Sequence, residues 1–196
     1  MHTPVKTLPT RGAEILQALE ADRALMTSWF EHMHRNPELS MREEKTAAYI
    51  ADLVRSWGYE VETGVGKHGV VASLTVGSGE KAIGLRADFD ALPIQEDSDL
   101  DYRSQVEGVA HLCGHDGHTT MLLAAGKYLA ETKNFNGTVR LIFQPGEETM
   151  EGAPAMIEDG LFERFPVDAV FGMHNMPGLE LGKLYFTPGE TMAAVD

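Results

Sequence analysis

The sequence lacks three features that would place it in familiar classes of protein. It has one cysteine in 196 residues, Cys113, so no internal disulfide can form and a disulfide-stapled secreted fold is excluded. No apolar run approaches the ~20 residues of a membrane-spanning helix, and no apolar stretch near the N-terminus suits a signal peptide. We therefore expect a cytoplasmic protein with no membrane partner.

Positive charge is also scarce. The chain carries 16 Lys and Arg against 30 Asp and Glu, a formal net charge of −14. Nucleic-acid binding needs clustered Lys and Arg, so no nucleic-acid partner is expected. At 43% hydrophobic and 23% charged residues, the composition is that of a globular chain rather than a disordered one. The length suits one domain.

The hydrophobic pattern predicts helices that alternate with strands. Apolar residues recur at helical spacing over residues 13–35, 42–57, 119–133 and 153–158. Strand-like runs lie at Val70–Val76, Lys81–Ala87, Gly137–Phe143, Ala169–Met173 and Lys183–Phe186. This alternation predicts an α/β fold, with a central mixed sheet and helices on both faces.

Ligands of open α/β sheets bind beyond the carboxyl ends of the strands, so the polar segments there are the first candidates for a site. The richest is HLCGHDGH at 111–118, which holds four of the nine Cys and His side chains of the chain, at 111, 113, 115 and 118. Thiolate and imidazole are the ligands that zinc and similar ions prefer. A helix beginning near Thr119 is expected to help stabilise the Cys113 thiolate. The alternative is a helix-capping turn that happens to be rich in histidine.

Three further segments carry candidate groups. The segment 86–93 (RADFDALP) is acidic, and such a loop is most often solvated. In FQPGEET at 143–149, one of the adjacent carboxylates Glu147 and Glu148 can bind a metal while the other acts as general base. His174 follows the run 169–173 and is expected to be a ligand if these loops share one edge of the sheet.

The remaining histidines show no such pattern. His32 and His34 lie within the first helical stretch, while His2 and His68 lie in a tail and a turn. We expect structural or solvated roles for all four.

Four ordered motifs together resemble a known family. They are RADFDALPIQE at 86–96, HLCGHDGHTTMLLAAGKYL at 111–129, FQPGEETMEGA at 143–153 and GMHNMPGL at 172–179. The chain resembles the two-metal peptidase family that contains the aminoacylases and the bacterial glutamate carboxypeptidases. It is most similar to the amidohydrolase branch, with its hippurate hydrolases, indole-acetyl-amino-acid hydrolases and N-acyl-amino-acid deacylases.

The resemblance implies a hydrolase that cleaves the amide bond of a small N-acyl amino acid with two divalent metal ions. Zinc, manganese, cobalt and nickel all suit the mixed sulfur, nitrogen and oxygen ligand set. The implied metal ligands are Cys113, His115, Glu148 and His174, with Cys113 bridging the two ions. Glu147 is the implied general base. The implied supporting residues are Asp88, which orients a ligating histidine, Asp116 and His118.

The resemblance also implies that residues 1–186 are the N-terminal segment of an incomplete catalytic domain. Residues 187–196 would then begin the connection to a lid or dimerisation domain, and a further ligating histidine would lie beyond it. A homodimer or a homotetramer is left open for the full-length parent.

Two other functions stay open from the residues. The chain can be a metal-binding fragment that performs no turnover. Alternatively, Cys113 can be the nucleophile of a thiol hydrolase, with His115 or His118 as its base. That reading leaves the Glu147-Glu148 pair without a role.

Overall fold

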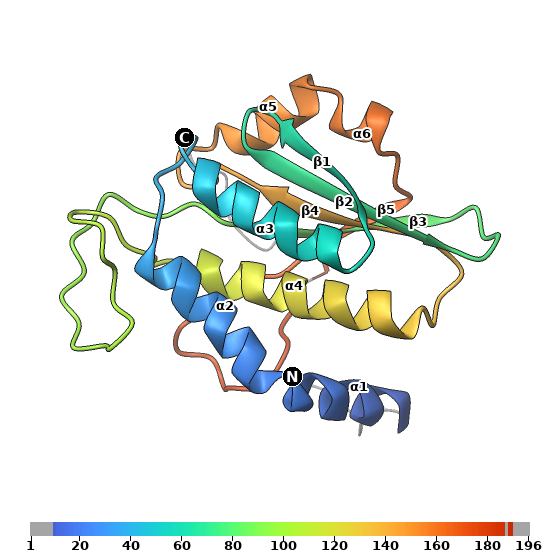
Figure 1. The fold of residues 1–196 in the computed structure, drawn as a ribbon, viewed down its shortest axis with the longest axis horizontal. Helices are drawn as coiled ribbons and strands as arrows, with labels where there is room; N and C mark the ends of the chain where they lie inside the picture. Colours follow the sequence, from blue (N-terminus) through green and yellow to red (C-terminus); the bar gives the residue numbers. More distant parts are fainter. Residues whose placement is uncertain (1–9, 187, 190–196) are drawn as a thin grey trace.

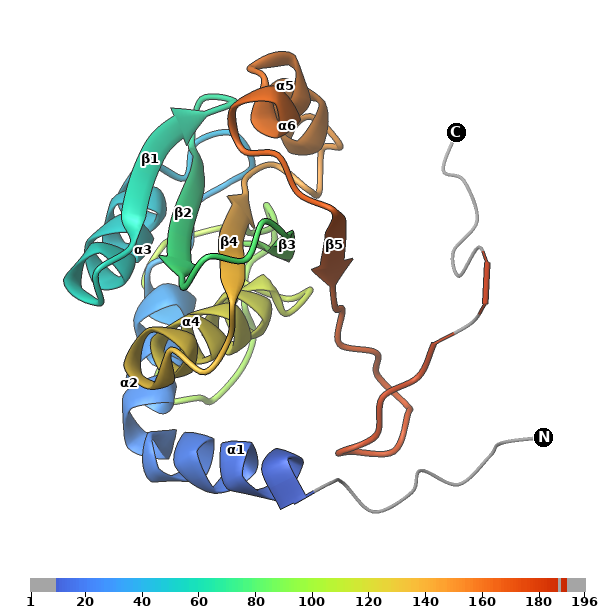
Figure 2. The same ribbon diagram turned by 90° about the vertical axis from the view of Figure 1, so that its right-hand side faces the viewer.

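The computed structural model describes residues 10–186, 188 and 189, which form a five-stranded sheet packed with helices (Figures 1 and 2). The helices are α1 (Thr10–Ala21), α2 (Arg23–Arg35), α3 (Glu44–Ser56), α4 (His115–Thr132), α5 (Gly152–Glu158) and α6 (Leu161–Arg164). The strands are β1 (Glu60–Val65), β2 (Gly69–Val76), β3 (Ala82–Asp88), β4 (Gly137–Gln144) and β5 (Ala169–Gly172). Their spatial order is β1-β2-β4-β3-β5.

The sheet is mixed, as predicted. β2 pairs antiparallel with β1 and β4, whereas β3 pairs in parallel with β4 and β5. The helix α4 forms the crossover between β3 and β4 that parallel pairing requires. Because β3, β4 and β5 run in one direction, the segments that follow Asp88, Gln144 and Gly172 leave the same edge of the sheet.

Helices cover both faces of the sheet, which confirms the predicted fold class. Alternate strand residues such as Val70, Leu141 and Phe143 belong to the main core, together with residues of α3 and α4. Their neighbours Val71 and Ile142 form a smaller core with Met156 of α5 and Leu161 of α6. In Figure 1, α3 and α4 lie below the strands, and α5 and α6 lie above them.

The structure corrects the predicted elements in four places. The helix expected over 13–35 is interrupted at Asp22, whose carboxylate binds the Lys127 ammonium of α4 at 2.7 Å. The strand expected at Lys183–Phe186 does not form, and Phe186 is 88% exposed. The strand β1 escaped prediction because it is a mostly exposed edge strand with little apolar content. Finally, α4 begins at His115 rather than near Thr119.

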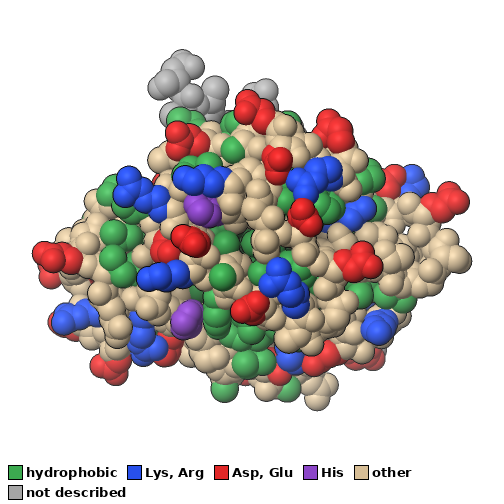
Figure 3. All heavy atoms as spheres, turned by 45° about the horizontal axis from the view of Figure 1, so that its top comes forward, with side chains coloured by type: hydrophobic (Ala, Val, Ile, Leu, Met, Phe, Trp, Pro, Cys, Tyr) green, Lys and Arg blue, Asp and Glu red, His purple; other side chains and the backbone are tan. Residues whose placement is uncertain are grey.

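The surface agrees with the scarcity of positive charge. In Figure 3, basic and acidic side chains are interspersed over the visible face, and basic residues form no continuous patch there. Among the described residues, no helix has both the length and the apolar character needed to cross a membrane. Of the expected connecting segment 187–196, only residues 188 and 189 are described. His2 lies outside the described residues.

Candidate metal centre

Four segments converge at the carboxyl ends of the parallel strands. They are the end of β3, the start of α4 with the turn before it, the segment after β4 and the segment after β5. The side chains that they bring together are Asp88, Asp90, Cys113, His115, His118, Glu147, Glu148 and His174. The prediction that these loops share one edge of the sheet is therefore confirmed.

His115 lies at the centre of this group and is completely buried. Its Nδ1 lies 2.9 Å from the carbonyl oxygen and 3.1 Å from the carboxylate of Asp90, so this nitrogen carries the proton and donates it. Its Nε2 has no hydrogen-bond partner among the described residues. This nitrogen lies 3.7 Å from both Glu147 and Glu148 and 3.8 Å from Asp88. A carboxylate on one ring nitrogen and a free lone pair on the other is the usual arrangement of a ligating histidine.

Cys113 and His174 form the solvent-facing side of the group. The Cys113 sulfur lies 3.4 Å from Nε2 of His174, and Nδ1 of His174 donates to the Asn175 carbonyl at 2.6 Å. Gly114, with φ of 100°, lets the turn pass close to Asn175, the residue after His174, because a Cβ at position 114 would clash with the Asn175 side chain.

Three sets of three side chains each place one donor atom of every member within 4.8 Å of the others. The sets are Cys113, His115 and His174; His115, Glu147 and Glu148; and Asp88, His115 and His118. His115 belongs to all three. The first two sets contain all of the residues predicted as ligands and as general base.

His118 and Asp88 are more fully engaged. Nδ1 of His118 donates to Asp88 at 2.7 Å, and its Nε2 lies 2.6 Å from the side-chain oxygen and 3.0 Å from the backbone nitrogen of Asn175, so both ring nitrogens already have partners. The other oxygen of Asp88 pairs with Arg86 at 2.7 Å. Burial raises the pKa of Asp88, but the His118 hydrogen bond and the Arg86 charge outweigh it and lower the value to about 2.

The loop that carries Glu147 and Glu148 is fixed by two other carboxylates. The Glu148 backbone N–H donates to Asp90 at 3.0 Å, and the Gly146 N–H donates to the buried Glu43 at 2.8 Å. The Glu148 side chain is 20% exposed and that of Glu147 is 39% exposed. Glu147 is thus the more accessible of the two carboxylates.

The protonation equilibria show a site with an excess of negative charge. Burial raises the pKa of the Cys113 thiol to about 12, with further contributions from Glu148, Glu147 and Asp88. Burial lowers the pKa of His115, but Asp90 and the other carboxylates outweigh it and raise the value to about 9. In the metal-free chain, burial and the nearby carboxylates therefore favour the protonated thiol, and the help expected from the start of α4 stays a prediction for the metal-bound chain.

These features fit a divalent cation. The donors are one sulfur, two imidazole nitrogens and carboxylate oxygens, a set that suits zinc and its neighbours. Among the described residues, His115 Nε2 and Glu148 Oε1 are buried donor atoms without a hydrogen-bond partner. A cation would supply that partner and displace the protons of Cys113 and His115.

Prediction from the sequence missed several residues that support the group. Asp90, rather than Asp88, is the carboxylate on Nδ1 of His115. Its position two residues after Asp88, and thus on the same side of an extended segment, is a signal that could have identified it. Asp116 does not face the candidate ligands and instead bonds His34 at 2.7 Å. The sequence showed no pattern that identifies this partner of His34, but the buried, hydrogen-bonded ring agrees with the structural role expected for it.

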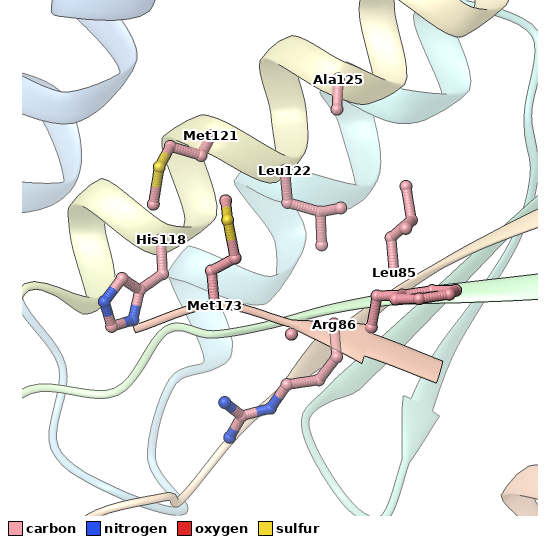
Figure 4. A pocket seen from close by; sticks show the side chains of 9 residues that line it. Leu85, Arg86, His118, Met121, Leu122, Ala125 and Met173 are labelled. Carbon is pink, nitrogen blue, oxygen red and sulfur yellow. The ribbon is translucent and has the colours of Figure 1, made fainter. Parts of the chain in front are cut away.

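An apolar hollow of about 210 Å³ lies beside the group, between α4 and the β3–β5 edge (Figure 4). The hollow is lined by Leu85, Leu122 and Met173, and the His118 ring lines one end of it. The hollow places an apolar surface next to polar, chemically active side chains, as ligand sites commonly do.

Comparison with known proteins gives consistent matches. A family model described as peptidase family M20/M25/M40 matches residues 84–194, a range that includes every residue of the group. The chain is 55% identical over 164 residues to the hippurate hydrolase of Campylobacter jejuni, covering 84% of this chain and 43% of that protein. It is 37% identical over 185 residues to the N-acyl-L-amino acid amidohydrolase of Geobacillus stearothermophilus, covering 93% and 50%.

A solved structure agrees with these relatives. The Bacillus subtilis YxeP protein, a dinuclear metal-binding peptidase of the M20 family, is 37% identical with a TM-score of 0.77. The match covers 82% of this chain and 45% of that one. The chain thus spans about half the length of the relatives it matches.

Proposed function

The chain belongs to the peptidase family M20/M25/M40, and from this premise we propose that it holds two divalent metal ions and serves the hydrolysis of N-acyl amino acids. The observation that carries the proposal is the free Nε2 of His115, which faces Glu147 and Glu148 while Asp90 occupies the opposite nitrogen. The hippurate hydrolase and the N-acyl-L-amino acid amidohydrolase among the relatives support this class of substrate.

In this proposal, Cys113, His115, Glu148 and His174 would hold the ions. When bound, the ions supply Lewis-acid chemistry, which polarises the scissile carbonyl and lowers the pKa of a water molecule. Zinc, manganese, cobalt and nickel all suit the donor set.

Glu147 is the proposed general base. It takes a proton from the attacking water and delivers it to the departing amine, as a carboxylate left free of metal can do. Its larger exposure compared with Glu148 supports this division of roles. Asp90 keeps the His115 ring in one orientation, and Asp88 does the same for His118.

The wider setting is also proposed. The partner is a small-molecule substrate, neither nucleic acid nor membrane, and the location is cytoplasmic. Residues 1–186 belong to the catalytic domain, residues 187–196 begin the connection to a further domain, and the parent protein forms a homodimer or a homotetramer.

Two alternatives make different predictions. A metal-binding fragment would bind ions without turnover. A thiol hydrolase needs a reactive Cys113 thiolate, and the rise of the Cys113 pKa to about 12 speaks against it. Chelator-insensitive, iodoacetamide-sensitive hydrolysis would favour the thiol mechanism.

The test uses the chain alone and a chimaera in which it replaces the matching half of the C. jejuni hippurate hydrolase. Metal content and hippurate hydrolysis are measured for wild type and Glu147→Gln, with Glu158→Gln on the exposed side of α5 as control. We expect Glu147→Gln to lower kcat by about 100- to 10,000-fold while metal content stays constant. Loss of metal from this variant, or unchanged kcat, contradicts the assigned role. Metal without turnover in the chain alone, together with turnover in the chimaera, supports the fragment alternative.

A further inference from the structure

A second cluster of buried charged side chains lies beside the candidate metal centre. It consists of His34, Glu96 and Asp116, whose side chains are 8%, 4% and 3% exposed. His34 comes from the last turn of α2, Glu96 from the segment between β3 and α4, and Asp116 from the first turn of α4. The cluster therefore ties together three parts of the chain.

Both ring nitrogens of His34 face a carboxylate. Nδ1 lies 2.7 Å from Asp116, and Nε2 lies 3.2 Å from Glu96. A neutral imidazole has one N–H, so it would turn a lone pair toward one of the two carboxylates, whereas an imidazolium donates to both. The hydrogen bond to Asp116 is the largest of the influences that raise the pKa of His34. Its place in the last turn of α2 also favours positive charge.

Glu96 extends the cluster into the segment between β3 and α4. Its Oε1 also accepts from the Ser98 hydroxyl at 2.5 Å, and its Oε2 accepts the Ser104 backbone N–H at 2.6 Å. The ring of Tyr102 packs edge-on against His34 at 5.3 Å between ring centroids. This segment is therefore held against the C-terminal end of α2.

The turn that carries Cys113 is anchored on both sides. Before it, Ala110 and Leu92 exchange two backbone hydrogen bonds of 3.0 and 3.1 Å. After it, Asp116 is bound by His34. Cys113 and His115 lie between these two anchors, so their separation depends on both.

We propose that His34 is a positioning residue, which bridges Asp116 and Glu96 as an imidazolium and thereby holds Cys113 and His115 in place for a metal ion. The inference rests on the proposed metal centre. His34 acts through Asp116 rather than as a ligand.

The test compares His34→Gln with His32→Gln, a control on the same helix whose ring stacks on Tyr49 at 4.1 Å outside the cluster. Glu96→Gln keeps the size of the side chain while removing one charge, and it decides the question if His34→Gln does not fold. Three quantities are measured on each folded chain: the affinity for Co²⁺ from the thiolate–cobalt absorption band, the rate of Cys113 alkylation by iodoacetamide without metal, and the melting temperature. Cys113 is the only cysteine in the sequence, so both thiol readouts are specific.

We expect His34→Gln to bind Co²⁺ about tenfold more weakly, as loss of outer-shell support does in other metal sites. Its Cys113 should be alkylated several-fold faster, and Glu96→Gln should change both quantities in the same direction. His32→Gln should match wild type. A lower melting temperature with unchanged affinity and alkylation rate would show a purely structural role and overturn the proposal.

The two proposals fail in different ways. If the wild-type chain binds no Co²⁺, the proposed metal centre is wrong, and the alkylation rates alone then decide on His34. Equal alkylation of wild type and the cluster variants overturns the positioning role, whereas faster alkylation of the variants supports it.

Discussion

The two sides of the candidate metal centre are held by different means. The inner side consists of Asp88, Asp90, His115 and His118, which are all buried and bonded to one another or to neighbouring backbone. The outer side depends on His174, which is exposed and follows β5, a strand whose four residues are all exposed. Among the described residues, β5 pairs with β3 alone. The inner donors are therefore preorganised by the core, while the outer donor depends on a lightly packed segment.

The largest effect is expected from Asp90→Asn on the inner side. Asp90 accepts from the His115 ring, the Ser40 hydroxyl and the Glu148 backbone N–H, and an amide NH₂ cannot replace both oxygens. We expect metal affinity to fall by about 100-fold, at the upper end for loss of such a partner. The melting temperature should fall as well, because a buried N–H loses its acceptor.

The control for this variant is Asp97→Asn, at an exposed position in the following segment. Metal titration and thermal unfolding are measured on both. An unchanged melting temperature in Asp90→Asn would show that the inner side is not preorganised as described.

A smaller and purely functional effect is expected from His174→Gln on the outer side. Water can take the place of an exposed ligand, so we expect a fall in metal affinity that is smaller than that of Asp90→Asn. The melting temperature of the metal-free chain should not change, because the side chain is exposed. Calorimetric titration and thermal unfolding test both parts, and a destabilised metal-free variant would erase the contrast between the two sides.

The cluster around His34 predicts a pH dependence of stability. The folded-state pKa of His34 is raised, chiefly by its hydrogen bond to Asp116. The stability that His34 contributes is therefore complete below pH 6.5, its ordinary pKa, and is lost as pH rises through the raised pKa. Burial raises the pKa of Glu96, but the hydrogen bonds of its carboxylate outweigh burial and lower the pKa below its ordinary value. The stability that Glu96 contributes is therefore present above pH 4.5 and is lost as pH falls through the lowered pKa.

The contribution of this cluster to the stability of the metal-free chain should therefore be greatest between pH 4.5 and pH 6.5, the ordinary pKa values of Glu96 and His34. Hydrogen bonds to charged groups contribute about 1.5–3 kcal/mol each, and we expect the free energy of unfolding to change with pH by an amount of this order. Urea unfolding of wild type and His34→Gln over a pH series measures it. Parallel pH profiles for the two proteins would exclude His34 as the titrating group.

The smallest effect is expected from Phe171→Ser in β5. The side chain is 58% exposed and belongs to neither core cluster, so the free energy of unfolding should change by no more than about 0.5 kcal/mol. Urea unfolding measures this, with the buried Phe143→Ala as the contrasting variant, which should lose about 3–5 kcal/mol. Comparable losses in the two variants would mean that β5 is packed as tightly as the rest of the sheet.

The sequence predicted the central strands and the positions of the donor groups because both depend on local pattern. The run at Gly137–Phe143 is β-branched and apolar, and it forms the buried β4 with one added residue. Cys113, His115, Glu148 and His174 were identifiable because residue type and position after a strand both favour ligands.

The supporting contacts could not be predicted because they join residues far apart in the chain. His34 meets Asp116 across 82 residues and Glu43 meets Gly146 across 103, and no local pattern encodes either pair. The choice of Asp90 over Asp88 as the partner of His115 depends on how α4 docks on β3, which local spacing does not determine. The break at Asp22 likewise depends on Lys127 of a distant helix.

The most direct test of the central claim is the position of the metal itself. Crystals of the chain grown with zinc and measured at the zinc absorption edge locate the ion by anomalous scattering. We expect an anomalous peak bounded by Cys113, His115 and His174, with Glu148 adjoining it and Asp90 still bonded to Nδ1 of His115. A well-occupied peak elsewhere, or none at this edge of the sheet in zinc-loaded crystals, would contradict the assignment of these residues as the metal site.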